Sequence, residues 1–212
     1  MKIVFFGDSI TDMCRHREDA DGTVYSYGVG YPNFVVGELS YLYPTKYEFI
    51  NRGISGNRIV DLYARAKIDV WNHKPDVVSI LIGVNDVWHE ISRENGVELP
   101  RWEKIYRELL EETKKRLPGV KLIICEPFIL EGSATDGEER WARFLEVKEY
   151  AKVAKKLAEE VGAEFVPLQE KFDEATKECG TEPYLFDGVH PTAAGAKLIA
   201  TEWLKAFDKI KE

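Results

Sequence analysis

The sequence lacks the features that several classes of protein require. It contains no apolar stretch of roughly 18 residues, so we expect no membrane-spanning helix. It has no basic excess: 29 Lys and Arg against 37 Asp and Glu leave a formal net charge of -8. This charge argues against a nucleic-acid partner, which would demand a basic face. No repeat or Pro/Gly/Ser-rich linker interrupts the 212 residues, so we expect one domain over residues 1–212.

Cysteine is also scarce. Cys14, Cys125 and Cys179 are scattered and odd in number, and they form neither CxxC nor Cys/His metal spacing, so we expect no metal site. The apolar run near Met1 is too short for a signal peptide, and no small-residue cleavage site follows it. Reduced thiols in a cytoplasmic protein are the simplest account, with Cys125 in the core.

Short, continuous apolar runs recur along the chain. They are rich in Val, Ile and Phe and do not alternate with polar residues, which is typical of strands covered on both faces. We predict five such strands, at Ile3–Phe6, Glu48–Asn51, Val77–Ile82, Leu122–Cys125 and Glu164–Leu168.

Longer segments with helical spacing lie between these runs. Their apolar stripes are Phe34–Leu42, Ile59–Val70, Trp102–Leu110, Phe144–Leu157 and Ala196–Phe207, the last with Thr192 as N-cap. The Lys/Glu-rich part, Glu138–Glu160, is expected to be one helix with a solvated face. Alternation of strand and helix implies right-handed crossovers and a parallel sheet. We therefore predict a three-layer, doubly wound α/β fold of the flavodoxin-like kind, with five strands in the order 2-1-3-4-5.

Polar, Gly-rich stretches follow the first three predicted strands. They are Gly7-Asp8-Ser9, then NRGISGN at residues 51–57, then GVND at residues 83–86. Each stretch alone consists of ordinary turn formers. Because the three strands are neighbours in the predicted order, however, their carboxyl ends should converge on one crevice, where ligands bind in such sheets.

A serine hydroxyl is a poor nucleophile without a base, and no histidine stands in a convincing position near Ser9 in the sequence. The segment FDGVHPTAAG offers one, because His190 lies in a short loop held by Pro191 directly before the last predicted helix. Asp187, three residues earlier, could then hold the other ring nitrogen. The alternative is that Ser9 and Asp187 serve turns and His190 is an ordinary residue at the start of a helix.

Four blocks, GDS, GISGN, GVND and DGVHP, resemble in order and spacing those of the SGNH hydrolases, the GDSL-type lipases and esterases. The resemblance covers most of the chain, and Ile10 stands where a leucine is frequent. The segments GISGNRIVDLYAR and KPDVVSILIGVNDVW are most similar to acetylxylan-esterase-type carbohydrate esterases.

The resemblance implies an SGNH fold and a serine esterase that needs no cofactor. Ser9 would be the nucleophile, His190 the general base and acid, and Asp187 its orienting partner. The expected substrate is a short-chain ester, in particular an acetyl group on a carbohydrate. Thioesters and lysophospholipids remain alternatives within the superfamily. A carbohydrate-binding protein that has lost catalysis is a further alternative, disfavoured because no catalytic position is missing.

The resemblance also implies an oxyanion hole. Its donors would be the backbone N–H groups of Ser9 and Gly56 and the side-chain amide of Asn85. Gly56 is preferred to Gly53 because the contributing glycine of the family precedes an Asn-like position, here Asn57. A glycine lets the backbone come close to the substrate, and a neutral amide donates without adding charge.

Four further residues are candidates for substrate binding. Asp8 is expected mainly to shape the turn by hydrogen bonding. Arg58 could pair with a substrate group or with surface acids. Trp88 could be a core residue or a cleft wall that stacks on a sugar ring, and Phe186 could wall the acyl pocket.

Other titratable residues have weaker claims. Asp8 and Asp86 could form a carboxylate pair of the glycosidase kind, but that would leave the serine and histidine without a role. His16, His73 and His89 show no ligand spacing and are expected on the surface or in loops.

The segment at residues 12–31 is long, polar and rich in Gly and Tyr. Loops of this length in a compact domain are usually functional, so we expect it to cover the cleft or to pack against another subunit. The Tyr and Trp content makes a homo-oligomer plausible.

Overall fold

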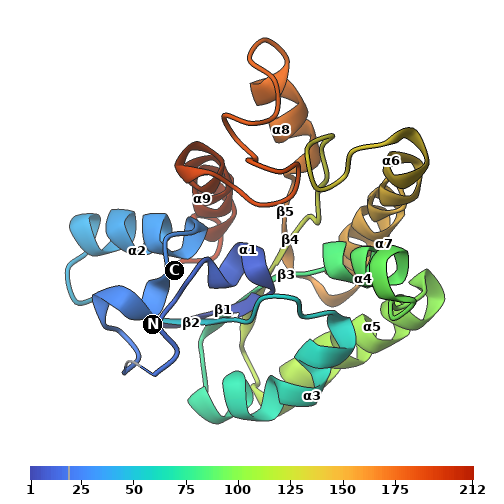
Figure 1. Ribbon diagram of the computed structural model, residues 1–212. Helices are drawn as coiled ribbons and strands as arrows, with labels where there is room; N and C mark the ends of the chain where they lie inside the picture. The colour runs from blue at the N-terminus through green and yellow to red at the C-terminus, as the bar shows by residue number, and fades with distance from the viewer. Residues whose placement is uncertain (19) are drawn as a thin grey trace.

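The computed structural model describes residues 1–18 and 20–212, and a sheet of five parallel strands forms its centre (Figure 1). The strands are β1 (Lys2–Gly7), β2 (Glu48–Gly53), β3 (Val77–Leu81), β4 (Lys121–Cys125) and β5 (Glu164–Val166). Their order is β2-β1-β3-β4-β5, which confirms the predicted fold and strand order. The central strands β1 and β3 are almost wholly buried, as their continuous apolar sequences predict.

Helices cover both faces of the sheet. Helix α2 packs against α9 on one face, and α3, α5 and α7 lie side by side on the other (Figure 1). The helices are α1 (Ser9–Asp12), α2 (Tyr31–Leu42), α3 (Ile59–Asp69), α4 (Val84–Arg93), α5 (Leu99–Arg116), α6 (Glu138–Phe144), α7 (Val147–Val161), α8 (Gln169–Thr176) and α9 (Ala193–Phe207), with 3₁₀ turns η1 (Val24–Tyr27) and η2 (Trp71–His73).

The predicted helix Glu138–Glu160 is wrong in one respect, because it is divided into α6 and α7. Between them the backbone hydrogen bonds span three residues, as in a 3₁₀ helix, and not four. They run from the N–H of Glu146 to the carbonyl of Arg143 and from the N–H of Lys148 to that of Leu145, each at 3.1 Å. Phe144 and Val147, on either side of this turn, are both fully buried. The segment is therefore anchored to the core rather than only a solvated surface.

A buried polar contact attaches α9 to the middle of the sheet. The indole Nε1 of Trp203 donates to the hydroxyl of Ser79 on β3, at 2.8 Å. Trp203 also packs against Phe5 of β1, with ring centroids 5.4 Å apart. Because α9 follows directly on the loop of His190, this contact fixes where that loop can lie.

The carboxyl ends of three strands lie at one level. Gly7 of β1 pairs with Gly53 of β2 on one side and with Leu81 of β3 on the other. The three polar stretches therefore begin side by side.

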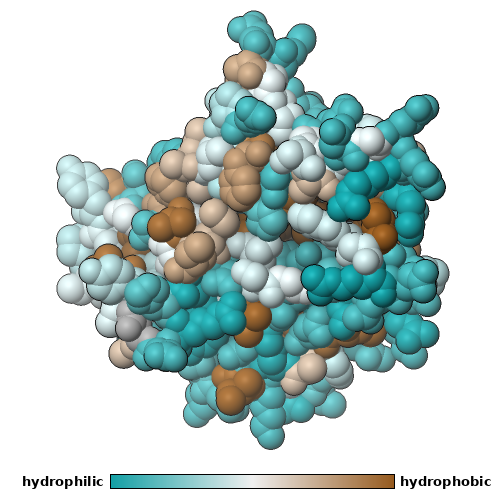
Figure 2. All heavy atoms as spheres, viewed as in Figure 1, coloured by the Kyte–Doolittle hydropathy of each residue, from teal (hydrophilic) through white to brown (hydrophobic). Residues whose placement is uncertain are grey.

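The surface of the molecule is largely hydrophilic. Seen from the same direction as in Figure 1, apolar residues gather over α1 and the start of α9 (Figure 2). None of the helices in the described part of the chain is long and apolar enough to cross a membrane.

Candidate active site

Ser9 is the first residue of α1, immediately beyond the end of β1. Asp8 is the N-cap of this helix, and its Oδ1 accepts the N–H of Ile10 at 3.0 Å. The first N–H groups of a helix have no partner within the helix, so the N–H of Ser9 is available to a ligand. The Oγ of Ser9 lies 2.9 Å from Nε2 of His190, which is 181 residues away in the chain.

The loop before α9 holds His190 in this position. Its Nδ1 lies 2.7 Å from Oδ2 of Asp187, while Oδ1 of Asp187 accepts the N–H groups of Val189 and His190. A bridge between Leu185 and Pro191 closes the loop at its base. The aspartate therefore fixes both the backbone of the loop and the orientation of the imidazole.

The environment shifts both pKa values. Burial alone would lower the pKa of His190, but the hydrogen bond and the charge of Asp187 outweigh it, and the pKa is raised. Burial would raise the pKa of Asp187, but hydrogen bonds from His190 and Val189 outweigh it, and the pKa is lowered. The pair therefore favours a charged carboxylate that stabilises a protonated imidazole.

Gly56 lies in a tight turn beyond the end of β2. The N–H of Asn57 donates to the carbonyl of Ile54 at 3.2 Å, and Gly56 has a φ of +82°. A type II turn requires such an angle at its third residue, which favours glycine. On the other side, Oδ2 of Asp12 accepts both the N–H and the Oγ of Ser55, each at 2.9 Å.

Asn85 lies in the first turn of α4, beyond the end of β3. The chain enters this helix through Gly83, whose φ is +143°. Any residue with a side chain would be strained at this angle. One N–H of the Asn85 amide donates to the carbonyl of Asn57 at 3.1 Å. This bond fixes the orientation of the amide, and the second N–H of Nδ2 is left for a ligand.

Ser9, Gly56, Asn85, Asp187 and His190 line one open cavity of about 610 Å³. The structure thus brings together the five residues that the resemblance assigns to the triad and the oxyanion hole.

Two aromatic side chains flank the histidine in the same cavity. The ring of Phe186 stacks on that of His190 at 5.6 Å, and the indole of Trp88 lies 5.9 Å from it. Trp88 also contacts the buried ring of Phe144, so it is held from behind. Phe186 is 54% exposed, and it therefore forms the outer rim of the cavity.

Comparison with known proteins agrees with this geometry. Residues 5–198 match the model of the GDSL-like lipase/acylhydrolase family. The chain belongs to this family. It is 39% identical over 209 residues to an acetylxylan esterase from Geobacillus stearothermophilus, covering 96% of this chain and 92% of the relative.

Solved structures show the same fold. A protein described as a GDSL-like lipase from Parabacteroides merdae superposes with a TM-score of 0.92 at 38% identity, covering 98% of this chain and 95% of that one. Axe2, an acetylxylan esterase from Geobacillus stearothermophilus, superposes with a TM-score of 0.86 at 38% identity, covering 97% and 93%. The solved structures of Axe2 include catalytic mutants in which a serine, an aspartate and a histidine are each replaced by alanine.

Two candidates for substrate binding do not reach the cavity of this GDSL-family chain. Asp8 is 1% exposed, and its carboxylate is committed to capping α1. The guanidinium of Arg58 binds Asp61 and the carbonyl of Asn95. Of the two expected roles for Arg58, pairing with surface acids therefore fits better than pairing with a substrate group.

Asp86 is likewise buried. Its Oδ1 accepts the N–H of Ile59 at the start of α3, and burial raises its pKa well above the usual value. Neither Asp8 nor Asp86 lines the cavity, which disfavours a carboxylate pair of the glycosidase kind.

The cavity also has walls that the sequence did not indicate. Three of them, His89, Ser92 and Arg93, come from α4, which was not predicted as a helix. His89, which was expected on the surface or in a loop, therefore lies on a helix and lines the cavity. The signal was present, because Val84, Val87, Trp88 and Ile91 have helical spacing.

The remaining walls are Ser55 and two residues from the start of segment 12–31, Met13 and Cys14. Further along that segment, the carbonyl of Tyr27 accepts from Asn51 of β2. The segment thus forms one edge of the cavity and packs along β2, although residue 19 lies outside the described residues.

The other histidines lie away from the cavity. His16 stacks on the ring of Tyr25, and Nε2 of His73 lies 3.2 Å from the guanidinium of Arg52. In residues 1–18 and 20–212, no group of three or more His, Cys, Asp and Glu side chains is arranged to hold a metal ion.

Proposed function

We propose that this chain is a serine esterase that hydrolyses short-chain esters, foremost acetyl esters of carbohydrates. The observation that carries the proposal is the continuous contact from Ser9 Oγ to His190 Nε2 at 2.9 Å and from His190 Nδ1 to Asp187 Oδ2 at 2.7 Å. Membership of the acylhydrolase family and 39% identity to an acetylxylan esterase support the reaction class and the acetyl group.

In the acylation step, Ser9 Oγ attacks the ester carbonyl carbon and its proton passes to His190 Nε2. The carbonyl oxygen gains a negative charge, which the N–H groups of Ser9 and Gly56 and the amide of Asn85 stabilise by hydrogen bonds. When the intermediate collapses, the carbon–oxygen bond to the alcohol breaks. The alcohol leaves with the proton from His190, and the acyl group remains on Ser9.

In the deacylation step, a water molecule gives its proton to His190 Nε2 and attacks the acyl carbon. The second intermediate uses the same oxyanion donors. Its collapse returns the proton to Ser9 Oγ and releases the carboxylic acid. Asp187 remains a carboxylate throughout and stabilises the imidazolium of each step, which agrees with its lowered pKa.

The rings of the cavity support a carbohydrate as the alcohol part. Phe186 and Trp88 flank His190, where the leaving alcohol must accept its proton. Aromatic rings bury large apolar areas in a fixed geometry, and the apolar face of a sugar ring offers a matching surface. The name of Axe2, an acetyl-xylooligosaccharide esterase, points in the same direction.

The test is an acyl-length series of 4-nitrophenyl esters, from acetyl to octanoyl, followed by acetylated xylo-oligosaccharides. We expect kcat/KM to fall steeply beyond butyryl. Ser9→Ala should lower kcat roughly 10⁴- to 10⁶-fold, and Asn85→Ala about 10²- to 10³-fold. A rise towards octanoyl would favour a lipid or thioester substrate. If a fluorophosphonate labels the wild type no better than Ser9→Ala, the chain is a binding protein and not an esterase.

A further inference from the structure

The turn at residues 54–57 must be held firmly if Gly56 is to stabilise an oxyanion. Oxyanion donors act only within about 2.7–3.1 Å of the developing charge. At one end the N–H of Ile54 donates to the carbonyl of Gly7, at 3.0 Å. At the other end of the turn, the side chain of Asn57 is held by the side chain of another residue.

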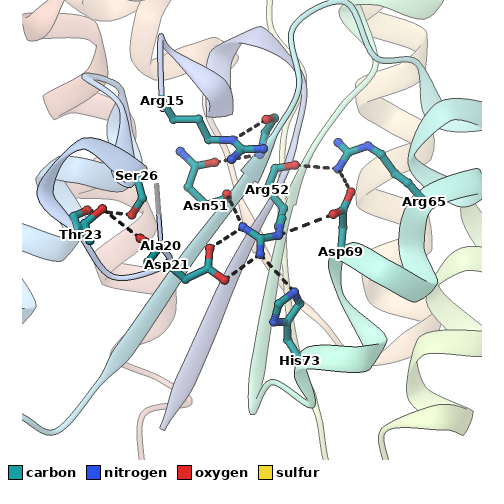
Figure 3. Close-up of polar contacts among 11 residues, drawn as sticks. Arg15, Ala20, Asp21, Thr23, Ser26, Asn51, Arg52, Arg65, Asp69 and His73 are labelled. Carbon is teal, nitrogen blue, oxygen red and sulfur yellow. Dashed lines mark hydrogen bonds and ion pairs between the residues drawn. The ribbon is translucent and has the colours of Figure 1, made fainter. Parts of the chain in front are cut away.

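That side chain is Arg65 of α3, and it makes four hydrogen bonds from one guanidinium. Its Nε donates to Oδ1 of Asn57 at 2.6 Å, and its Nη2 donates to the carbonyl of Gly7 at 3.0 Å. Its Nη1 donates to the carbonyl of Arg52 at 2.8 Å and to Oδ2 of Asp69 at 2.7 Å. Figure 3 shows Arg65 and Asp69 reaching from α3 towards Arg52 on β2.

These contacts connect three parts of the candidate site. Gly7 precedes the Asp8–Ser9 segment, Arg52 lies at the end of β2, and Asn57 follows Gly56. A guanidinium is planar and presents its donors in a fixed fork, so it sets the distances between its acceptors. A lysine has one point charge on a flexible stem and cannot satisfy all of these acceptors together.

The connection continues to the second oxyanion donor. The carbonyl of Asn57 accepts from the amide of Asn85 at 3.1 Å. Asn57 therefore bridges Arg65, through its side chain, to Asn85, through its backbone. A displacement of Asn57 would move Gly56 and turn the amide of Asn85 at once.

The surroundings of Arg65 favour one position for the guanidinium. Its side chain is 13% exposed, and the guanidinium lies 4.4 Å from the centre of the Phe6 ring. Burial lowers the pKa of Arg65, and the ion pair with Asp69 opposes this change. An arginine remains charged under such conditions, so its donors are always present.

We propose that Arg65 is a positioning residue for the oxyanion hole, which it holds through Asn57 at the spacing that the transition state requires. The inference rests on the proposed function, because it assumes that Gly56 and Asn85 stabilise the oxyanion. Arg65 itself is not among the residues that line the cavity. Its loss should therefore reduce kcat and leave substrate binding almost unchanged.

The test compares Arg65→Lys with a matched control, Arg116→Lys, by steady-state hydrolysis of 4-nitrophenyl acetate. Arg116 also lies 4.4 Å from an aromatic ring, that of Trp71, and pairs with an acid one helical turn away, Glu112, but it does not line the cavity. A misplacement of about 1 Å can cost about 100-fold in rate. We expect Arg65→Lys to lower kcat by about 10- to 100-fold with KM within about threefold, and Arg116→Lys to change neither by more than about twofold.

A second variant, Asn57→Ala, removes only the acceptor of the Arg65 Nε bond and keeps the backbone carbonyl that Asn85 needs. It should lower kcat by about tenfold on its own. In the Asn57→Ala background, Arg65→Lys should cost no more than about threefold further, because residues that act as one unit are not additive. This variant also tests the proposal if Arg65→Lys fails to fold.

The outcomes separate the two proposals. If Asn85→Ala lowers kcat as expected but Arg65→Lys and Asn57→Ala stay within twofold of wild type, only the positioning role is overturned. The same conclusion follows if the two losses in kcat multiply independently, or if KM rises while kcat is unchanged. If Asn85→Ala retains wild-type kcat, the oxyanion hole itself is refuted, and with it the role of Arg65.

Discussion

Replacing Asp8 with asparagine is expected to stabilise the folded protein at neutral and alkaline pH. The carboxylate is 1% exposed and its Oδ2 has no hydrogen-bond partner among the described residues. Burial raises its pKa from 3.8 to about 7, although the N–H of Ile10 and the charge of His190 oppose this change. An asparagine Oδ1 can accept the same N–H and is equally suited to an N-cap.

The magnitude follows from the pKa. A carboxyl group with a raised pKa binds its proton more tightly in the folded state, so its contribution is complete below about pH 4 and is lost as the pH rises. The difference between 3.8 and about 7 corresponds to roughly 4 kcal/mol, at about 1.36 kcal/mol for each pH unit. Asparagine does not titrate, so the free energy of unfolding of the variant relative to that of the wild type should rise as the pH rises. The rise between about pH 4 and pH 8 should equal this amount.

Urea unfolding of the wild type and Asp8→Asn at several values between pH 4.5 and pH 8.5 measures the effect. Asp136→Asn is the control for the loss of one carboxylate, since Asp136 is exposed and also accepts a nearby backbone N–H, that of Gly137. The reasoning is refuted if the difference in the free energy of unfolding between Asp8→Asn and wild type does not change with pH. A second measurement is kinetic: because the charge of Asp8 raises the pKa of His190, the variant should retain activity to lower pH.

Two further predictions concern catalysis. Because the hydrogen bond that His190 donates to Asp187 outweighs burial and raises the pKa of His190 above 6.5, kcat/KM should rise with pH through a midpoint above that value as the imidazole loses its proton. A pH–rate profile with its midpoint below pH 6 would contradict this. Removal of the rim ring in Phe186→Ala should raise KM for acetylated xylo-oligosaccharides about two- to tenfold, which corresponds to about 0.5–1.5 kcal/mol of aromatic contact. Hydrolysis of 4-nitrophenyl acetate should change less, and equal losses on both substrates would show that Phe186 does not bind the sugar.

The sequence was sufficient for the sheet because burial on both faces leaves a strong signal. Continuous runs of Val, Ile and Phe predicted all five strands, and their alternation with helices indicated the doubly wound fold whose strand order the sheet has. Only the ends differ: the last strand was predicted to reach Leu168 and stops at Val166, because Pro167 has no N–H to donate. The convergence of Ser9, Gly56 and Asn85 followed from that order, since neighbouring parallel strands end at the same edge.

The parts that the sequence could not supply depend on contacts between backbone and side chain. Arg65 binds the carbonyls of Gly7 and Arg52, and every residue has a carbonyl, so no pattern of residue types reveals this bond. Helix α4 was overlooked for a different reason. Its first turn carries the GVND block, which reads as a loop motif although the apolar spacing continues for two more turns.

The cavity has two walls of different character, with consequences for how this chain can change its substrate. On one side, Asp12 of α1 accepts two hydrogen bonds from Ser55, so the helix that begins with Ser9 and the turn that contains Gly56 are joined to each other. On the other side, successive turns of α4 present Trp88, His89 and Arg93 to the same space. Adaptation to larger or differently charged alcohols can therefore proceed by exchanging side chains on α4 while the reacting groups stay where they are.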